Sequence, residues 1–326
     1  MSQRRRHTTF PTAALVGALA VGLLAACGSS AAAPGSPASS SSSSADPSTD
    51  KLAQVTARGT LVLSTDLGYA PQSYEVAGSR RNADTKCAAN QLTGNQLTGY
   101  DAETGKAVAL KLGVEPCFVT PAWTEVTAGG WSDRWDVSWG SGAITADRMS
   151  RLYVTQPAYS TPNVVFVSAG SPIKTLSDLD GKTVGACAGC TMEQYLRGTL
   201  VLPGVTTTLV FKPTIATYDN EVPGLKAVAA GKIDAFLCSE PVGQGQIKAG
   251  VKLRELSPEA YQSYNTGYVD HASGLSSVAF VAAIDKAMVD LHADGTLSAL
   301  SLKFFGVDYA AAAAKFDMSA LGQKVS

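Results

Sequence analysis

The feature that most constrains this chain is an alternation of short apolar segments with segments of helical apolar spacing, which starts at Leu52. Apolar runs of strand length occur at 61–63, 137–139, 164–167, 184–186 and 233–237. Helical spacing occurs at 101–112, 225–231, 281–292 and 297–305. Such alternation predicts an α/β fold in which central parallel sheets are flanked by helices.

Residues 1–26 have the features of an export signal peptide, which is removed from the mature chain. Three arginines at 4–6 form a basic start, and the apolar run at 13–26 is shorter than the roughly 20 residues of a membrane-spanning helix. The run ends in the sequence LAACG at 24–28, which resembles a bacterial lipobox. We therefore expect cleavage before Cys27 and a lipid on its sulfur. The alternative is an ordinary signal peptide with an incidental cysteine.

Residues 27–51 are expected to be the lipidated cysteine followed by a flexible linker, because this stretch is rich in serine and lacks large apolar side chains. Three of the 26 Lys and Arg residues lie in the signal. The mature chain therefore has fewer basic residues than its 27 Asp and Glu, and it is acidic. An acidic chain without a basic run argues against nucleic acid as a partner, and leaves the lipid as the contact with the membrane. About 275 residues remain, enough for two lobes of ordinary size.

Five cysteines follow Cys27, and an exported chain meets an oxidising compartment in which disulfides are expected. Because five is odd, at least one thiol stays unpaired within a single chain. The stretch 78–97 is polar, contains one of these cysteines and interrupts the α/β rhythm. We interpret it as a surface insertion, which is either functional or disordered.

Short motifs follow one another in a fixed order between residues 60 and 308. They are TDLGYAP at 65–71, LTGYD at 97–101, WDV at 135–137, ITADR at 144–148, LSDLDGKTVG at 176–185, AGKIDA at 230–235 and KFFG at 303–306. In this order they resemble the bacterial extracellular solute-binding proteins of the amino-acid-binding type, family 3, which serve ABC importers.

The resemblance implies the two-lobed, type II periplasmic-binding-protein-like fold, with a cleft between the lobes and two crossing strands as a hinge. Lobe 1 would comprise 52–160 and 271–326, and lobe 2 would comprise 161–270. The crossings would lie at 155–160 and near Gly267. Lobes of this kind close on a ligand by a hinge motion.

Arg148 is the first candidate for ligand binding, since the resemblance implies that it clamps a ligand carboxylate. A guanidinium offers a planar fork that matches a carboxylate with two hydrogen bonds. Arg148 follows a predicted strand, at the sheet edge where α/β proteins bind ligands. The alternative is a surface arginine paired with an acid such as Asp147.

The resemblance places further residues in the cleft. Cys190 and Thr191 would start a helix whose free N–H groups help to hold the same carboxylate, and Thr191 would also suit the N-cap. Tyr69 and Trp123 would offer aromatic faces to the ligand side chain, and the alternative for both is that they are core aromatics. Trp139 is either a third such face or part of the core. The remaining cleft positions are Asp66, Ser141 and Ala143, the last through its backbone alone.

One departure from the family affects the choice of ligand. Relatives that bind α-amino acids carry an aspartate at the end of the strand 233–237, facing the ligand ammonium. This chain has Ser239 there, followed by Glu240, which would reach the ligand only if the backbone were shifted by one residue. Because burying an unpaired ammonium is costly, a carboxylate ligand is more firmly indicated than an α-amino acid.

The implied topology also suggests disulfide pairings. Cys87–Cys117 would join the insertion to lobe 1. The strands that end at Cys187 and Cys238 would be neighbours, so Cys187 or Cys190 could pair with Cys238, and Cys187–Cys190 is the remaining option. A redox-active site at 187–190 is disfavoured outside a thioredoxin-like context. We expect neither a metal nor a cofactor, because the histidines lie far from the cysteines in sequence.

These observations predict a substrate-binding lipoprotein of an ABC importer, held at the outer face of the cytoplasmic membrane. It would be a monomer that captures a small carboxylate-bearing solute, an amino acid or a similar molecule, and delivers it to a membrane permease. We do not expect an enzyme. The alternatives are a dehydratase-like cleft enzyme, with Glu240 or Glu193 as its acid, and a ligand-sensing module for a membrane receptor.

Overall fold

The computed structural model describes residues 45–131 and 134–326. The predicted signal peptide, the lipidation site Cys27 and the serine run lie outside the described residues. Helix α1 (Lys51–Arg58) begins at the last residue of the predicted linker, and the carboxylate of Asp50 caps it by accepting a hydrogen bond from Ala53 N at 2.8 Å. Asp50 also forms a β-bridge with Ser276, so the start of the fold is tied to its C-terminal part.

Within the described residues, eleven strands form one continuous sheet, in the order β11-β10-β12-β9-β14-β7-β1-β6-β4, with β8 and β13 paired beside it. The strands are β1 (Thr60–Ser64), β4 (Leu92–Thr93), β6 (Glu115–Val119), β7 (Val137–Ala143), β8 (Leu152–Val154), β9 (Tyr159–Ser168), β10 (Thr183–Cys187), β11 (Thr214–Tyr218), β12 (Ala235–Ser239), β13 (Leu253–Glu255) and β14 (Tyr261–Asp270). A small second sheet contains β2 (Gly68–Tyr69), β3 (Ser73–Glu75) and β5 (Leu97–Thr98). The predicted α/β fold is confirmed.

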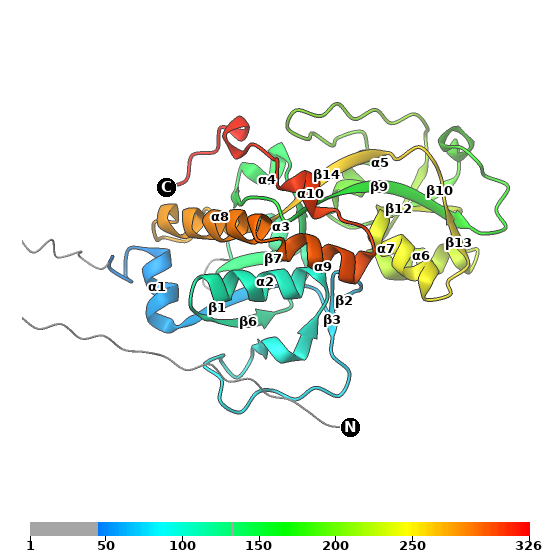
Figure 1. The fold of residues 1–326 in the computed structure, drawn as a ribbon. Helices are drawn as coiled ribbons and strands as arrows, with labels where there is room; N and C mark the ends of the chain where they lie inside the picture. The colour runs from blue at the N-terminus through cyan, green and yellow to red at the C-terminus, as the bar shows by residue number, and fades with distance from the viewer. Residues whose placement is uncertain (1–44, 132–133) are drawn as a thin grey trace, which may run out of the picture. The chain divides into compact units, whose positions relative to one another are not determined.

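Two long strands, β9 and β14, run through the middle of this sheet as an antiparallel pair (Figure 1). Their register joins Tyr261 to Asn163 and Asn265 to Tyr159. The later part of β9 pairs with β12, and the later part of β14 pairs with β7. These two strands therefore connect one set of parallel strands (β1, β6, β7) with the other (β10, β11, β12).

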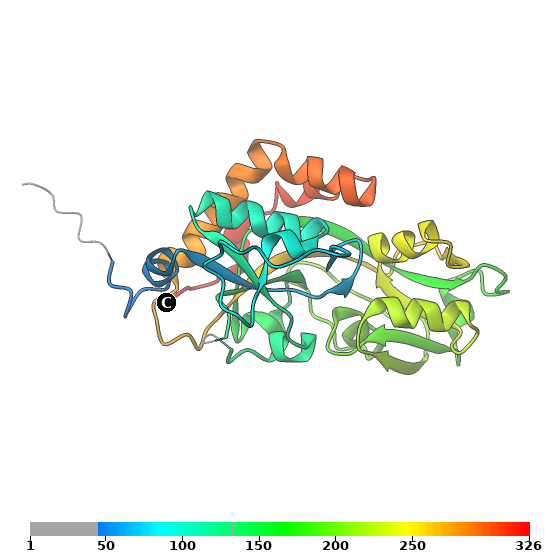
Figure 2. The same ribbon diagram turned by 90° about the horizontal axis from the view of Figure 1, so that it is seen from below.

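The helices pack on the two strand sets separately. They are α2 (Tyr100–Lys111), α3 (Trp123–Ala128), α4 (Ala146–Met149), α5 (Thr191–Leu196), α6 (Glu221–Ala229), α7 (Glu240–Lys248), α8 (Val278–Ala293), α9 (Thr296–Phe305) and α10 (Ala310–Ala313), with short 3-10 turns at Gly94–Gln96, Leu176–Leu179 and Met318–Leu321. Figure 2 shows α8 and α9 in orange beside the cyan helix α2. The yellow helices α6 and α7 contact each other and pack on β12. Among the described residues, no helix is both long enough and apolar enough to cross a membrane.

Separate hydrophobic cores accompany the two strand sets, which we call lobe 1 (β1, β6, β7) and lobe 2 (β10, β11, β12). In lobe 1, Leu61, Leu63 and Phe280 are fully buried in a core between the strands and α2, α8 and α9. In lobe 2, side chains of β9 alternate, so that Val165 faces one core and Phe166 faces another across the sheet. Burial of each such side chain contributes about 1.5–3 kcal/mol to the free energy of folding. Each lobe is therefore stabilised by its own core. The residue limits proposed for the lobes stay a prediction.

The insertion at 78–97 is an ordered part of lobe 1. The guanidinium of Arg81 donates to the carbonyl oxygens of Cys87 and Gln91, and β4 within the insertion pairs with β6. The disulfide Cys87–Cys117 links the insertion covalently to β6, as the family topology suggested. No residue of the insertion lines the cavity described below.

The second disulfide joins Cys187 to Cys190, and Cys238 is a buried free thiol. Cys187 and Cys238 do lie on neighbouring strands, as expected. However, Cys187 packs in one lobe 2 core and Cys238 in the core on the other face of the sheet. The sheet therefore separates these two side chains, and the pairing with Cys238 does not occur.

Candidate functional site

A cavity lies where the two lobes meet, and both lobes line it. The ends of four parallel strands contribute to it, since Ser64, Ala143, Cys187 and Ser239 close β1, β7, β10 and β12. The crossing strands add Asn163 and other polar residues. The carboxyl ends of parallel strands are where α/β sheets bind ligands, so this cavity is the candidate site.

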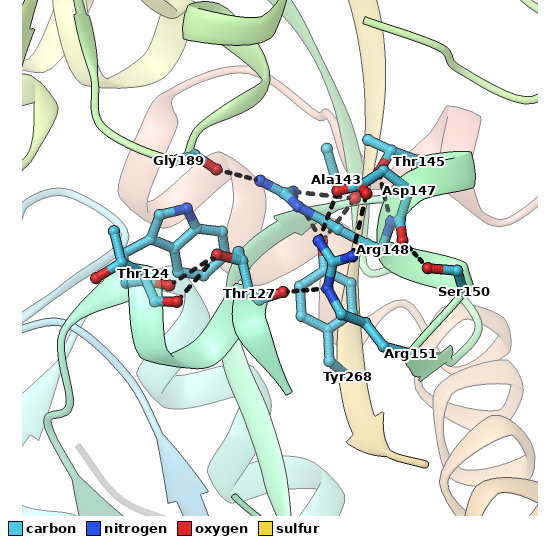
Figure 3. Close-up of polar contacts among 11 residues, drawn as sticks. Thr124, Thr127, Ala143, Thr145, Asp147, Arg148, Ser150, Arg151, Gly189 and Tyr268 are labelled. Atoms are coloured by element: carbon cyan, nitrogen blue, oxygen red, sulfur yellow. Dashed lines mark hydrogen bonds and ion pairs between the residues drawn. The ribbon is translucent and has the colours of Figure 1, made fainter. Parts of the chain in front are cut away.

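Arg148 forms part of the cavity wall in lobe 1. It lies in α4, directly after β7, and the Thr145 hydroxyl fixes the helix start by accepting from Arg148 N at 3.1 Å. Only 2% of the residue is exposed. Nη1 donates to Ala143 O at 3.1 Å and to Tyr268 Oη at 2.9 Å, and Nη2 donates to Gly189 O of lobe 2 at 3.0 Å (Figure 3). These bonds hold the guanidinium in one orientation.

The guanidinium of Arg148 still has donors to offer. Of its five N–H groups, the Nε–H and one Nη2–H have no partner among the residues that the structure describes. Within the same residues no carboxylate pairs with Arg148; Asp147 instead pairs with Arg151 at 2.6 Å (Figure 3). The alternative of a surface pair between Arg148 and Asp147 is therefore wrong. A buried cation with two open donors can bind a carboxylate.

Two aromatic rings contact this cation. The guanidinium carbon of Arg148 lies 5.2 Å from the centroid of Trp123 and 5.8 Å from that of Tyr268. At these distances the ring faces stabilise the positive charge and restrict its motion. Trp123 also lines the cavity, and so does Tyr69. Trp139, in contrast, is buried in the lobe 1 core and does not line the cavity.

The disulfide loop of lobe 2, residues 187–190, contributes the disulfide-bonded residues Cys187 and Cys190 to the cavity lining. Its central residue Gly189 accepts from Arg148 and donates its own N–H to Glu193 Oε2 at 2.8 Å. The helix that follows, α5, has only six residues and Cys190 as its N-cap. Thr191 is therefore the first helical residue and not the cap; its Oγ1 accepts from Tyr261 Oη at 2.9 Å.

The remaining predicted residues of lobe 1, Asp66, Ser141 and Ala143, all line the cavity. Ser141 adopts φ 56°, an unusual conformation for a residue with a side chain, and its hydroxyl bonds to Asp101 and to Tyr159. Burial raises the pKa of Asp101 to about 7, while the hydrogen bonds from Ser141 and Tyr159 lower it. The buried carboxyl group of Asp101 thus holds the hydroxyl of Ser141, a residue of the cavity lining, in place.

Ser239 also lines the cavity, but Glu240 does not. The carboxylate of Glu240 accepts from Tyr309 Oη at 2.9 Å instead, because α7 begins at Glu240 and turns its side chain away from the end of β12. The shifted backbone that would bring Glu240 to a ligand is not observed.

Sequence reasoning missed Glu221, which lines the cavity and is 1% exposed. Ser239 donates to its carboxylate from the hydroxyl at 3.3 Å and from the backbone N at 3.5 Å. Burial raises the pKa of Glu221 to about 8, and hydrogen bonds from Ser239 and Tyr69 lower it. In sequence, Glu221 is an ordinary acid in the first turn of α6, and no local signal places it beside Ser239.

Several buried polar atoms of the cavity lining have no hydrogen-bond partner among the described residues. They are Ser64 Oγ, Thr65 Oγ1, Trp123 Nε1 and Asn163 Oδ1. A buried polar group without a partner costs about 1–3 kcal/mol. The cavity wall is therefore built to bind a polar molecule. Within the described part of the chain, no cluster of three or more His, Cys, Asp or Glu residues could hold a metal ion.

Comparisons with known proteins show what this chain is similar to. The L-cystine-binding protein TcyJ of Escherichia coli K12 is 28% identical over 259 residues, which cover 79% of this chain and 86% of that protein. The lysine/arginine/ornithine-binding periplasmic protein of Escherichia coli K12 is 26% identical over 76% of this chain and 87% of that protein.

Among solved structures, the ancestral amino acid-binding protein AncCDT-1, a precursor of cyclohexadienyl dehydratase, matches with a TM-score of 0.65. It is 22% identical, and the match covers 78% of this chain and all of that chain. This likeness confirms the periplasmic-binding-protein-like fold. The model of bacterial extracellular solute-binding proteins, family 3, matches residues 86–307. The chain therefore belongs to the bacterial extracellular solute-binding proteins of family 3.

Proposed function

We propose that this protein captures an amino acid in the cavity between its lobes and delivers it to the permease of an ABC importer. The buried guanidinium of Arg148 carries the proposal, because it has two open donors, no carboxylate partner in the described chain and a place in the cavity wall. The relatives named as binding cystine or basic amino acids support the same ligand class.

In this proposal the ligand carboxylate accepts two hydrogen bonds from Arg148. Backbone and hydroxyl groups at Ser141, Ala143 and Thr191 surround it, on the two sides of the cavity. The ligand side chain lies between Tyr69 and Trp123, with Asp66 available to a polar or cationic end. Cys190 contributes through its loop, which fixes Gly189 against Arg148.

The bond from Arg148 Nη2 to Gly189 O joins the two lobes, so we infer that the cavity closes by a hinge motion of lobe 1 (52–160 and 271–326) against lobe 2 (161–270). The strand pair β9 and β14 would bend at the level of the cavity, where Asn163 and Asn265 line it. Small-angle scattering of the free and the amino-acid-bound protein measures this closure as a decrease in the radius of gyration.

We further propose that the chain is exported by its signal (1–26) and held at the outer face of the cytoplasmic membrane by a lipid on Cys27. The LAACG sequence at 24–28 supports this. The test is fractionation of a bacterial host that expresses the full chain. The wild type should be found with membranes, and the Cys27→Ala variant should not; equal membrane association of both would refute lipid anchoring.

The experiment for the ligand is a thermal-shift panel of the common amino acids and L-cystine, followed by calorimetry of the amino acid that stabilises the protein most. Arg148→Ala should weaken binding by at least about 30-fold, the effect of removing one partner of a buried charge pair. Arg134→Ala is the control, because Arg134 is exposed, pairs with Glu125 and does not line the cavity. Retained affinity in Arg148→Ala would refute the carboxylate clamp.

The enzyme alternative receives less support from the contacts of its named acids. Glu240 lies outside the cavity lining, and Glu193 is engaged by Arg197 at 2.7 Å and by Gly189 N. Neither faces the cavity as a free acid. Recovery of the bound amino acid unchanged after long incubation separates binding from turnover.

A further inference from the structure

Glu221 is an acid in the cavity wall that the carboxylate clamp does not use. Its side chain comes from the first turn of α6 in lobe 2, whereas Arg148 belongs to lobe 1. Both line the same cavity. The site thus has one buried group that binds an anion and, on the other lobe, one buried group that can bind a cation.

No basic residue in the described part of the chain neutralises Glu221. Among the residues that the structure describes, no Lys, Arg or His forms a salt bridge with it. The titratable groups that act on it or feel its charge are Tyr69, Asp66, Cys238, Tyr159 and Tyr261, and none of these is a cation. A buried carboxylate without a cationic partner is costly, so the group has a reason to take a cation from the ligand.

The hydrogen bonds of Glu221 orient it toward the end of β12. Ser239 donates to it from both its hydroxyl and its backbone N, and the hydroxyl of Tyr69 lies 3.4 Å from the Ser239 hydroxyl. Ser239 and Tyr69 are themselves in the cavity wall. The carboxyl group therefore stands among polar cavity groups and is not sealed within the lobe 2 core.

We propose that Glu221 binds the α-ammonium group of the solute, so that the ligand is an α-amino acid and not a simple carboxylic acid. The inference rests on the proposed function, because it requires the ligand carboxylate to lie on Arg148. Glu221 then supplies, from a helix start, the negative charge that Ser239 at the strand end cannot supply. With the carboxylate and the ammonium fixed, the ligand side chain extends toward Asp66 and the aromatic rings.

Binding should release a proton. In the free protein, burial raises the pKa of Glu221 to about 8, so the carboxyl group is mainly protonated at pH 7. An ammonium partner favours the ionised form, and the proton leaves to the solvent. Calorimetry at pH 7 in buffers of different ionisation enthalpy should show release of up to about one proton per amino acid bound, and Glu221→Gln should abolish most of it.

The decisive experiment compares L-arginine, L-lysine, L-histidine, L-glutamine and L-cystine, each with its des-amino analogue, such as guanidinopentanoate for arginine or dithiodipropionate for cystine. For the amino acid that binds most tightly, Glu221→Gln should weaken binding by about 30-fold or more. The affinity for its des-amino analogue should change less than about threefold, since that molecule lacks the group that Glu221 binds.

The control is Glu255→Gln. Glu255 is an acid of lobe 2 whose pKa burial also raises, its side chain bonds to Gln244, and it does not line the cavity. This variant should bind as the wild type does. Thermal unfolding of the free variants checks folding, and Glu221→Gln is nearly isosteric and removes an unpaired buried acid.

The outcomes separate the two claims. Suppose that an amino acid binds the wild type. The role of Glu221 is refuted, and the clamp remains, if Glu221→Gln binds that amino acid equally well, or if the variant loses as much affinity for the des-amino analogue as for the amino acid. If only des-amino acids bind, the α-amino acid inference is refuted while Arg148 keeps its role. If no member of either series binds, the proposed function fails and this inference fails with it.

Discussion

The two disulfides should rank in opposite order for their contributions to stability and to ligand binding. Cys187–Cys190 closes a loop over a sequence separation of three residues, and Cys87–Cys117 closes one over 30. From the entropy of loop closure in the unfolded chain, removing the first costs about 2 kcal/mol of unfolding free energy and removing the second costs about 4 kcal/mol. The double variants Cys187→Ala/Cys190→Ala and Cys87→Ala/Cys117→Ala test this, because alanine buries no hydroxyl group.

The order should reverse for ligand affinity. The short disulfide holds Gly189, whose carbonyl oxygen accepts from Arg148 at 3.0 Å, and both of its sulfur-bearing residues line the cavity. A hydrogen bond to a charged group contributes about 1.5–3 kcal/mol, so loss of this contact should weaken binding by roughly tenfold or more. Cys87 and Cys117 do not line the cavity, and their removal should leave affinity unchanged.

Urea unfolding of the free variants measures the first effect, and calorimetry with the amino acid that binds the wild type most tightly measures the second. A thiol reductant should lower the affinity of the wild type if it reduces Cys187–Cys190. It should leave the affinity unchanged if it reduces Cys87–Cys117 alone. The reasoning is refuted if the variant without Cys87–Cys117 loses affinity while the variant without Cys187–Cys190 keeps it.

Three further predictions concern the scaffold. Asp136→Ala should lower the unfolding free energy by about 3–5 kcal/mol in urea titrations, because Asp136 pairs with buried Lys51 at 2.8 Å; a loss under 1 kcal/mol would contradict this. Gly142→Ala should weaken amino acid binding in calorimetry, since a Cβ there would lie 2.3 Å from the ring of Tyr268, which holds the clamp; unchanged affinity would contradict it. Asp101 has a folded-state pKa of about 7, so the folded chain keeps a proton that the unfolded chain releases above its ordinary value of 3.8. Stability should therefore fall as pH rises from about 4 to about 7, and Asp101→Asn should reduce that slope in thermal unfolding; an unchanged slope would count against the burial argument.

The strands and helices could be predicted well from the sequence, because buried strands and amphipathic helices leave a local pattern of apolar residues. The run 61–63 became β1, and the helix expected at 101–112 became α2. Arg148 could be placed because it directly follows a strand, and the ends of parallel strands meet at one edge. These inferences need only neighbours in sequence.

What the sequence could not predict depends on contacts between distant segments. Glu221 precedes Ser239 by 18 residues, and only the packing of α6 beside β12 brings their polar groups together. Likewise, Cys187 and Cys238 lie on neighbouring strands, but the face on which each side chain packs decides which pairs can form. Glu240 was a candidate from its position, yet α7 turns it toward Tyr309.

The most direct test of the central claim is a crystal structure of the protein with the amino acid that binds it most tightly. The account predicts that the ligand carboxylate lies within about 3 Å of Arg148 Nε and Nη2, in the cavity between β7 and the loop 187–190. A ligand whose carboxylate contacts other groups, with those two donors of Arg148 turned to the protein, would contradict it.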